Sequence, residues 1–201
     1  NGPLRIEAHQ TRCQPMAKVW RDGELVSEGG LSCWVTDAGG NGGNQFFAER
    51  DGEVRFGIEQ QGPMRVRLRW EGTHQDAEGR RHFDFVIRLS VFAGLPYVRV
   101  DHVFINRLDE AQTPVNQIAV SLPMRMSGPC NYTLGGASAG HFSRGTPYQA
   151  VASDEPARLD MTRFDRYDVT ALSGGKELAK GRKSMGWVSA ASAKRSVMLA
   201  G

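Results

Sequence analysis

Apolar and polar residues alternate along most of this chain, and this period of two constrains its fold more than any other feature. In the segment MRVRLRWEGTH, residues 64–74, one side of an extended backbone carries Arg65, Arg67 and Arg69. Val66 and Leu68 fall on the other side. No helical stripe longer than two turns appears. Short strands at fairly regular spacing, with turn signals between them, predict an all-β fold of the antiparallel sandwich or barrel type.

The longest predicted strands lie in the middle of the chain. Residues 64–73 and 82–93 flank the turn HQDAEGRR and are expected to pair as antiparallel neighbours. Further long strands are expected at 97–107 and at 116–126. Earlier in the chain, an Asp-Gly pair at Asp51–Gly52 is typical of a hairpin turn.

Composition and charge exclude several classes of function. The net charge of +3 is mild, and basic and acidic residues are interspersed, so no nucleic-acid partner is predicted. No apolar run approaches the roughly 20 residues that cross a bilayer, so no membrane partner is expected either. Twenty of the basic residues are Arg and five are Lys. This bias reflects either a GC-rich genome or the use of Arg where a planar fork must bind carboxylates.

The ends of the chain favour a domain taken from something longer. It opens on NGPLRIEAHQ, which has no signal-peptide pattern, and it stops at SVMLAG, within a strand-like pattern. We therefore expect residues 1–201 to form a single large antiparallel β-sandwich domain, excised from a longer multidomain chain.

The residues that most often bind metals give no recognised motif. The three cysteines, Cys13, Cys33 and Cys130, lack zinc-site spacing, and both one disulfide with a free thiol and three buried thiols fit the sequence. In the loop DAGGNGGN, Asp37, Asn41 and Asn44 offer hard oxygen ligands, but their spacing is not that of a known calcium loop. We expect no cofactor and no metal site, with calcium as a weak alternative.

Residues 63–107 carry a pattern that resembles a known family. The segments GPMRVRLRWEGTH, GRRHFDFVIRLSVF and AGLPYVRVDHVFINR resemble the central β-sandwich domain of exo-acting rhamnogalacturonan lyases and their YetA-like bacterial relatives. The opening NGPLRI and the closing GWVSAASAKRSVMLAG resemble the first and last parts of that domain, so the resemblance covers nearly the whole chain. It implies a supersandwich of the galactose-mutarotase-like type, in which two broad sheets pack face to face.

The resemblance also implies a function. Members of the family act on acidic, rhamnogalacturonan-like polysaccharide by β-elimination, which implies a secreted or periplasmic protein. A small β-barrel domain precedes the sandwich and an α/α toroid follows it, so neighbouring domains of the same chain are expected partners besides the acidic polysaccharide or oligosaccharide. We expect this domain to line the cleft and to be inactive alone. No motif fixes a catalytic residue position by position, so none is carried over.

β-Elimination from a uronate needs a group that neutralises the carboxylate, a base for the α-proton and an acid for the leaving oxygen. Arg67 and Arg69 are candidates for binding the carboxylate, and Trp70 is a candidate for stacking on a sugar. His74 is the candidate catalytic residue. It lies where a strand meets a polar turn, next to Trp70 and the arginines, and nothing in the pattern buries it.

Each candidate also has a structural interpretation. Alternation alone places the arginines on a solvated or inter-sheet face, where Asp84 or Asp101 could pair with them across strands. His102 shares a face with apolar residues, which favours a hydrogen-bonded histidine at the core edge. His141 lies in the glycine-rich segment 128–149, which is either a binding loop or an ordinary exposed loop. We retain His102 and His141 as candidate substrate-binding residues.

Three functions follow from these observations. A polysaccharide-lyase domain predicts arginine, histidine and tryptophan side chains on one surface. A non-catalytic carbohydrate-binding or structural sandwich module predicts arginines paired with Asp84 and Asp101. An epimerase-like sugar enzyme predicts a closed pocket with a histidine and a carboxylate, for which Glu71 near His74 is the one indication.

Overall fold

The computed structural model describes residues 2–39, 43–107, 114–126, 131–137, 148–150, 157–163, 168–173, 176–181 and 183–200. Within these ranges the regular structure is almost entirely β-strand, and neighbouring strands pair antiparallel. The predicted all-β antiparallel sandwich is confirmed. No helix in the described part of the chain is long and apolar enough to cross a membrane.

The strands form two compact units, residues 1–125 and 126–201. The first unit contains β1 (Leu4–His9), β2 (Gln14–Arg21), β3 (Glu24–Glu28), β4 (Ser32–Asp37), β5 (Gln45–Phe47), β6 (Arg55–Gln61), β7 (Arg65–Gln75), β8 (Arg81–Phe92), β9 (Val98–Ile105) and β10 (Val115–Ser121). A single 3-10 turn, Ala48–Arg50, lies between β5 and β6. The single domain expected over residues 1–201 stays a prediction.

The second unit is also built from antiparallel strands. They are β11 (Asn131–Ala137), β12 (Tyr148–Ala150), β13 (Ala157–Arg163), β14 (Asp168–Ser173), β15 (Lys176–Gly181), β16 (Lys183–Ala191) and β17 (Ser196–Ala200). Four of them form a sheet in the order β12-β11-β16-β17, and the other three form a sheet in the order β13-β14-β15.

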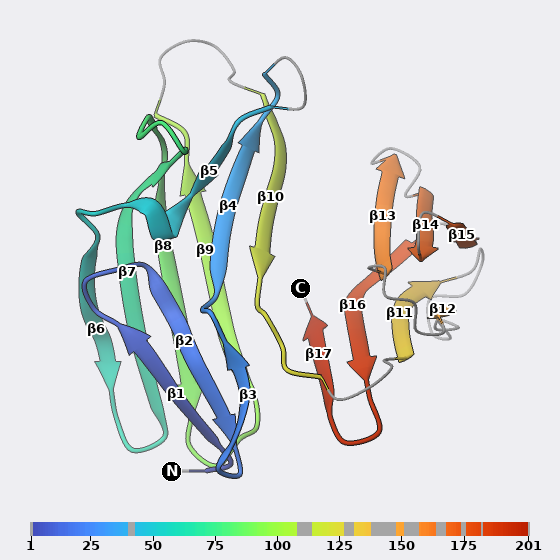
Figure 1. The fold of residues 1–201 in the computed structure, drawn as a ribbon, viewed down its shortest axis with the longest axis horizontal. Coiled ribbons are helices and arrows are strands. Elements are labelled where there is room, and N and C mark those ends of the chain that lie inside the picture. The colour runs from blue at the N-terminus through green and yellow to red at the C-terminus, as the bar shows by residue number, and fades with distance from the viewer. Residues whose placement is uncertain are drawn as a thin grey trace. The chain divides into compact units, whose positions relative to one another are not determined.

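Two sheets of unequal size form the first unit (Figure 1). The small sheet has three strands in chain order, β1-β2-β3. The large sheet has seven strands in the order β10-β4-β5-β7-β8-β9, with β6 also paired to β7. β6 pairs with residues 66–71 along one edge of β7, and β5 pairs with the same edge at Gln75. The large sheet therefore has β7 and β8 near its middle.

The central hairpin of the large sheet matches the sequence prediction. β7 and β8 pair over almost their full lengths, with Leu68 opposite Leu89 and Trp70 opposite Ile87. β8 then pairs with β9, where Ile87 lies opposite His102. The strands predicted at 64–73, 82–93 and 97–107 are thus confirmed. The strand predicted at 116–126 ends early, at Ser121, and pairs with β4.

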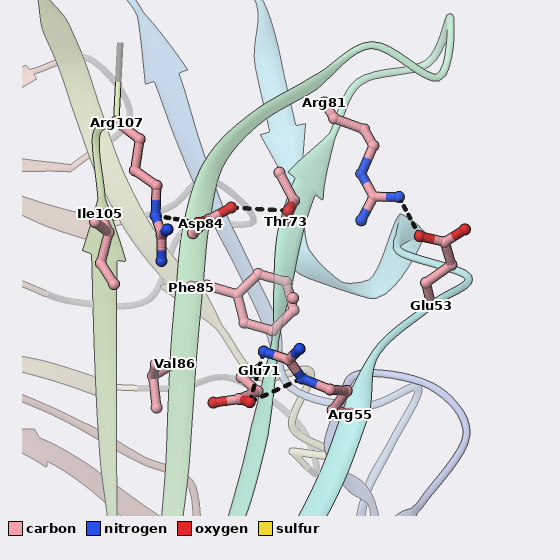
Figure 2. Close-up of a pocket in the computed structure, with 11 residues that line it drawn as sticks. Glu53, Arg55, Glu71, Thr73, Arg81, Asp84, Phe85, Val86, Ile105 and Arg107 are labelled. Carbon is pink, nitrogen blue, oxygen red and sulfur yellow. Dashed lines mark hydrogen bonds and ion pairs between the residues drawn. The ribbon is translucent and has the colours of Figure 1, made fainter. Parts of the chain in front are cut away.

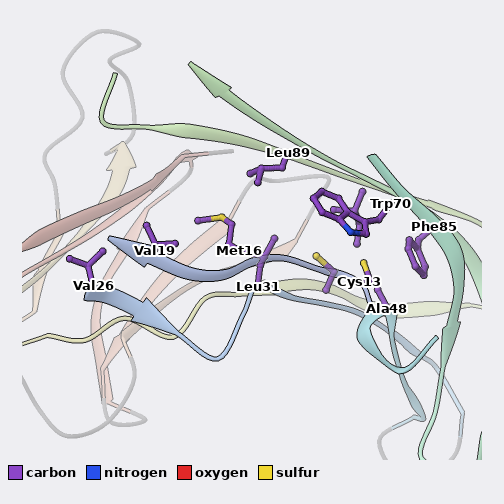
Figure 3. Close-up of a cluster of buried hydrophobic side chains, with 11 residues drawn as sticks. Cys13, Met16, Val19, Val26, Leu31, Ala48, Trp70, Phe85 and Leu89 are labelled. Atoms are coloured by element: carbon purple, nitrogen blue, oxygen red, sulfur yellow. The ribbon is translucent and has the colours of Figure 1, made fainter. Parts of the chain in front are cut away.

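The two faces of the large sheet differ in their side chains. The inner face packs against the small sheet, and the core between them includes Met16 and Val19 of β2, Trp70 of β7 and Leu89 of β8 (Figure 3). The outer face is the opposite side of the same strands and carries the arginines of β7. One hydrophobic face and one polar face are what strict alternation produces in an antiparallel sheet. This division decides which side chains can meet a ligand.

A buried carboxylate replaces the hairpin that was expected at Asp51–Gly52. That prediction is wrong, because β5 and β6 both run antiparallel to β7 and therefore cannot pair with each other as a hairpin. Asp51 is 1 % exposed. Its carboxylate accepts hydrogen bonds from the backbone N–H groups of Glu53 (3.0 Å) and Thr73 (2.8 Å), and from Gln75 Nε2 (3.2 Å). These bonds satisfy a charge that would otherwise be costly to bury.

We predict that Gly72→Ala strongly destabilises the protein. A Cβ at Gly72 would overlap the Asp51 carboxylate and lie 3.1 Å from the Phe85 ring. Overpacking typically costs about 1–3 kcal/mol, and displacing a bonded buried carboxylate adds to that cost. Urea unfolding of the 201-residue chain measures the loss.

Gly57→Ala is the matched control for this prediction. Gly57 lies on the neighbouring strand β6, and a Cβ there would meet nothing within 4 Å. We expect its free energy of unfolding to stay within about 1 kcal/mol of wild type. Equal losses in the two variants would contradict the assignment of Asp51 as a packed structural group.

Candidate functional site

The outer face of the large sheet gathers charged side chains from four strands. One row of the register runs from Arg69 of β7 through Arg88 of β8 to Asp101 of β9. A second row runs from Arg67 of β7 through Ser90 of β8 to Arg99 of β9. Arg55 of β6 lies opposite Glu71 at the other edge of β7. The alternation noted in the sequence therefore produces a broad polar face.

Most arginines of this face are held by carboxylates. Six form ion pairs: Arg55 with Glu71, Arg69 with Glu59 and Glu71, Arg81 with Glu53 and Asp51, Arg88 with Glu59, Arg99 with Asp101, and Arg107 with Asp84. The structural interpretation expected Asp84 and Asp101 to hold the arginine stripe of β7. They hold Arg107 and Arg99 instead, because Glu59 and Glu71 lie closer to that stripe.

Arg65 and Arg67 differ from these six. In the described part of the chain, neither forms an ion pair with a carboxylate. Arg67 Nε donates to the hydroxyl of Ser90 at 3.1 Å, and Arg65 donates to the side-chain carbonyl of Gln60. Neutral partners orient a guanidinium without cancelling its charge. The outer face therefore carries its excess positive charge where β7 begins.

A hollow of about 370 Å³ lies on this face, toward the end of β7. Figure 2 shows Arg107 with Asp84, Arg81 near Glu53, and Arg55 with Glu71 around it. Val86 and Ile105 contribute apolar surface to its lining. The hollow and the two unpaired arginines are the parts of the outer face with the chemistry of a binding site.

Trp70 does not lie on this face. Its side chain is 0 % exposed, its ring packs 5.2 Å from that of Phe56, and its Nε1–H donates to the backbone oxygen of His9 at 2.7 Å. The expected position beside the arginines is wrong, because Trp70 shares the strand parity of Val66 and Leu68. Trp70 therefore links the two sheets, and its ring has no surface for stacking on a sugar.

His74 is likewise on the inner side. It is 0 % exposed, although nothing in the sequence pattern predicted its burial. Its Nδ1 lies 2.7 Å from the Phe83 carbonyl oxygen, and its Nε2 lies 3.0 Å from Nε2 of His102. Phe83 adopts a left-handed backbone, with φ at 60°, beside a bulge in the β7–β8 pairing. The catalytic role of His74 stays a prediction, but both ring nitrogens are already engaged.

The two histidines form a directed chain of hydrogen bonds. Since a carbonyl can only accept, His74 Nδ1 carries a proton, and in the neutral ring Nε2 then accepts from His102 Nε2–H. Burial lowers the pKa of His74 to about 4, and the neighbouring Phe83 carbonyl opposes this only in part. Burial also lowers the pKa of His102 to about 4, with His74 adding to the effect. Both rings are thus neutral at pH 7.

The interpretation of His102 as a hydrogen-bonded histidine at the core edge is confirmed. Its role in substrate binding stays a prediction. His141 lies outside the described residues, so its predicted role is not tested. Glu71 and His74 lie on opposite faces of β7, and the described residues do not bring them together as the epimerase-like hypothesis requires.

Asp37, one of the candidate calcium ligands, is hydrogen-bonded within its own loop. Asp37 accepts hydrogen bonds from the backbone of Gly39 (3.0 Å) and from the backbone and side chain of Asn44 (2.7 and 3.2 Å). Asn41 lies outside the described residues, and within them no group of three His, Cys, Asp or Glu side chains could hold a metal. Cys13 and Cys33 are buried free thiols, and burial raises the pKa of both. Cys130 lies outside the described residues, so the two alternatives for the three cysteines stay predictions.

Sequence reasoning missed Glu59 and Ser90. Glu59 occupies a bulge between Ile58 and Gln60, and from there it reaches both Arg69 and Arg88. A regular strand register would not have predicted this double contact. Ser90 is buried on the outer side of β8 beneath Arg67. Its place opposite Arg67 follows from the hairpin register, so it could have been found from the β7–β8 alignment.

Comparison with known proteins gives one family. The family described as PcRGLX-like protein central beta sandwich domain matches residues 4–142. Comparisons with curated proteins and with solved structures give no match.

The histidine pair predicts a specific dependence of stability on pH. The folded protein keeps His74 neutral down to about pH 4, whereas an unfolded histidine takes up a proton below about pH 6.5. The free energy of unfolding must therefore fall as the pH decreases from 6.5 to 4, by about 3 kcal/mol for this one group. Urea unfolding at a series of pH values measures the slope.

His102→Asn and His9→Gln provide the comparison for this slope. We expect His102→Asn to flatten the slope between pH 6.5 and 4, because it removes one of the two buried imidazoles. His9 is an exposed residue whose contact with Trp70 uses only its backbone, so His9→Gln should keep the wild-type slope. An unchanged slope in His102→Asn would show that other groups cause the pH dependence.

Proposed function

Since this chain belongs to the family of PcRGLX-like protein central β-sandwich domains, we propose that its outer face lines a cleft for an acidic polysaccharide. The chain is the central β-sandwich domain of a rhamnogalacturonan-lyase-like protein. In this proposal the ligand lies across β6, β7, β8 and β9, whose outward side chains supply arginines in adjacent rows. The inner face is filled by the core and takes no part in binding.

The observation that carries the proposal is the difference between Arg65 and Arg67 and the other arginines of the face. Six arginines already have carboxylate partners, so binding a uronate would require them to exchange one anion for another. Arg65 and Arg67 are held by the neutral side chains of Gln60 and Ser90, so no carboxylate among the described residues offsets their charge. A guanidinium binds a carboxylate through two parallel N–H groups, which suits the acidic group of a uronate. Arg69, although paired, lies next along β7 and extends this positive surface.

The chemical role of these arginines would be to neutralise the uronate. β-Elimination begins with loss of the proton next to the carboxylate, and a cation beside the carboxylate stabilises the negative charge that develops. In this proposal the base and the acid come from groups other than His74, because its ring nitrogens already contact Phe83 and His102. We propose that neighbouring domains of the same chain supply them, and that the domain alone does not catalyse the reaction.

A non-catalytic carbohydrate-binding module is the second candidate. The burial of His74 and Trp70 favours it, because these residues were expected to supply the base and the stacking surface. Both candidates place an acidic polysaccharide on the same outer face. Both also imply a secreted or periplasmic protein that needs no cofactor for binding, since polysaccharides of this kind lie outside the cytoplasm.

We predict that Arg67→Gln weakens binding of rhamnogalacturonan oligosaccharides. The loss of a charge-assisted hydrogen bond should lower the affinity about tenfold. Wild-type affinity should also fall when the salt concentration is raised from about 50 mM to about 500 mM, because salt screens the attraction between charges. Isothermal titration of the 201-residue chain measures both effects.

Arg99→Gln is the control for a general loss of charge. Arg99 lies on the same face and in register with Ser90, but its Nε donates to Asp101 at 2.8 Å. We expect its affinity to fall less than about threefold, since its charge is already balanced. Equal losses in both variants would reject a specific role for Arg67, and unchanged binding in Arg67→Gln would reject the proposed binding face.

A further inference from the structure

The hollow near the end of β7 has a different charge balance from the region around Arg65 and Arg67. Three arginines line it, and each is paired with a carboxylate that also lines it: Arg55 with Glu71, Arg81 with Glu53, and Arg107 with Asp84. The charges of the lining residues therefore cancel. Each arginine that lines the hollow already has a carboxylate partner, so an acidic ligand group would have to compete with that carboxylate.

We propose that this hollow binds a neutral sugar unit, while Arg65 and Arg67 bind the acidic units of the same chain. This inference rests on the proposed function, because it assigns a substrate class to one part of the proposed binding face. It adds that the face distinguishes neutral from acidic sugars by position along β7.

The polar groups of the hollow match sugar hydroxyls. A hydroxyl both donates and accepts, so two neighbouring hydroxyls can bind one guanidinium N–H and one carboxylate oxygen at the same time. The Arg107–Asp84 pair provides both kinds of group: Arg107 Nε lies 2.6 Å from Asp84 Oδ2, and both side chains line the hollow. The Arg55–Glu71 and Arg81–Glu53 pairs also place a guanidinium beside a carboxylate at the hollow (Figure 2). Arg55 uses both Nε and Nη2 for Glu71, and Arg81 contacts Asp51 through Nη2 as well as Glu53 through Nη1.

Two of the carboxylates are fixed before any ligand binds. Asp84 Oδ1 accepts a hydrogen bond from the Thr73 hydroxyl at 2.8 Å, while Oδ2 faces Arg107. Glu71 uses one oxygen for Arg55 and the other for Arg69. Side chains held at two points lose little further freedom on binding, which favours weak, directional ligands such as sugars.

The hollow also offers an apolar surface of suitable size. Val86 and Ile105 lie in its lining between the charged pairs, and Ile105 is partly exposed. A pyranose ring has an apolar C–H face that packs on such side chains. The volume of about 370 Å³ lies near the lower end of the range for ligand pockets, about 300–1,000 Å³. This size is that of a site for a small ligand.

Saturation-transfer NMR with the 201-residue chain tests the proposal. The probes are the methyl glycosides of galactose, glucose, mannose and rhamnose, together with that of galacturonic acid, which differs from galactose only at C6. We expect at least one neutral glycoside to bind wild type and to bind Arg107→Gln about tenfold more weakly. Arg107 is 74 % exposed at the end of β9, so its replacement should leave the fold intact.

Asp84→Asn gives a readout that a structural role would not produce. It keeps the side-chain volume but frees Arg107 from its carboxylate, so the hollow gains a net positive charge. We expect the neutral glycoside to bind more weakly and galacturonate to bind more tightly than to wild type. The proposal is overturned if no neutral glycoside binds, if both variants bind it as wild type does, or if wild type prefers galacturonate in the hollow.

Arg67→Gln separates this proposal from the function proposed above. It should leave binding of the neutral glycoside unchanged, because Arg67 does not line the hollow. If Arg67→Gln has no effect on acidic oligosaccharides while Arg107→Gln still abolishes neutral binding, the acidic-polysaccharide function fails and the neutral sugar site stands. The reverse pair of results rejects the sugar site alone.

Discussion

Burial of one face of β7 against the small sheet is the constraint on which the rest of the structure depends. Every polar group that alternation places on that face must find a partner inside the protein. Trp70 bonds to the His9 backbone, and His74 bonds to both Phe83 and His102. At the edge of β7, Asp51 is held by the backbone of Thr73. These contacts occupy the polar groups of the inner face and stabilise the sandwich.

On the outer face, charge is arranged unevenly along the strands. Paired arginines and carboxylates surround the hollow near the end of β7, whereas Arg65 and Arg67 near its beginning have neutral partners. A homogeneous anionic ligand would gain little from the paired region. The distribution of partners, more than the number of arginines, therefore carries the functional argument.

The sequence predicted the hairpin of β7 and β8 well, because it depends on local alternation and on one turn. It also predicted that His102 lies at the core edge with apolar neighbours. It failed for Trp70 and His74, which were placed beside the arginines because they are close in sequence. Strand parity already assigned Trp70 to the face of Leu68. The burial of His74 could not be predicted, since it depends on the Phe83 carbonyl and on His102 two strands away. The same holds for Glu59, whose contacts with two arginines require a bulge.

The central claim is that ligands meet the outer face of β7 and not the inner one. A ¹H–¹⁵N NMR titration of the 201-residue chain with rhamnogalacturonan oligosaccharides observes both faces at once, through the Nε–H groups of Arg65 and Arg67 and the Nε1–H of Trp70. The account predicts that the arginine signals shift while the Trp70 signal, protected by its bond to His9, stays in place. A shift of the Trp70 signal with unmoved arginine signals would contradict it.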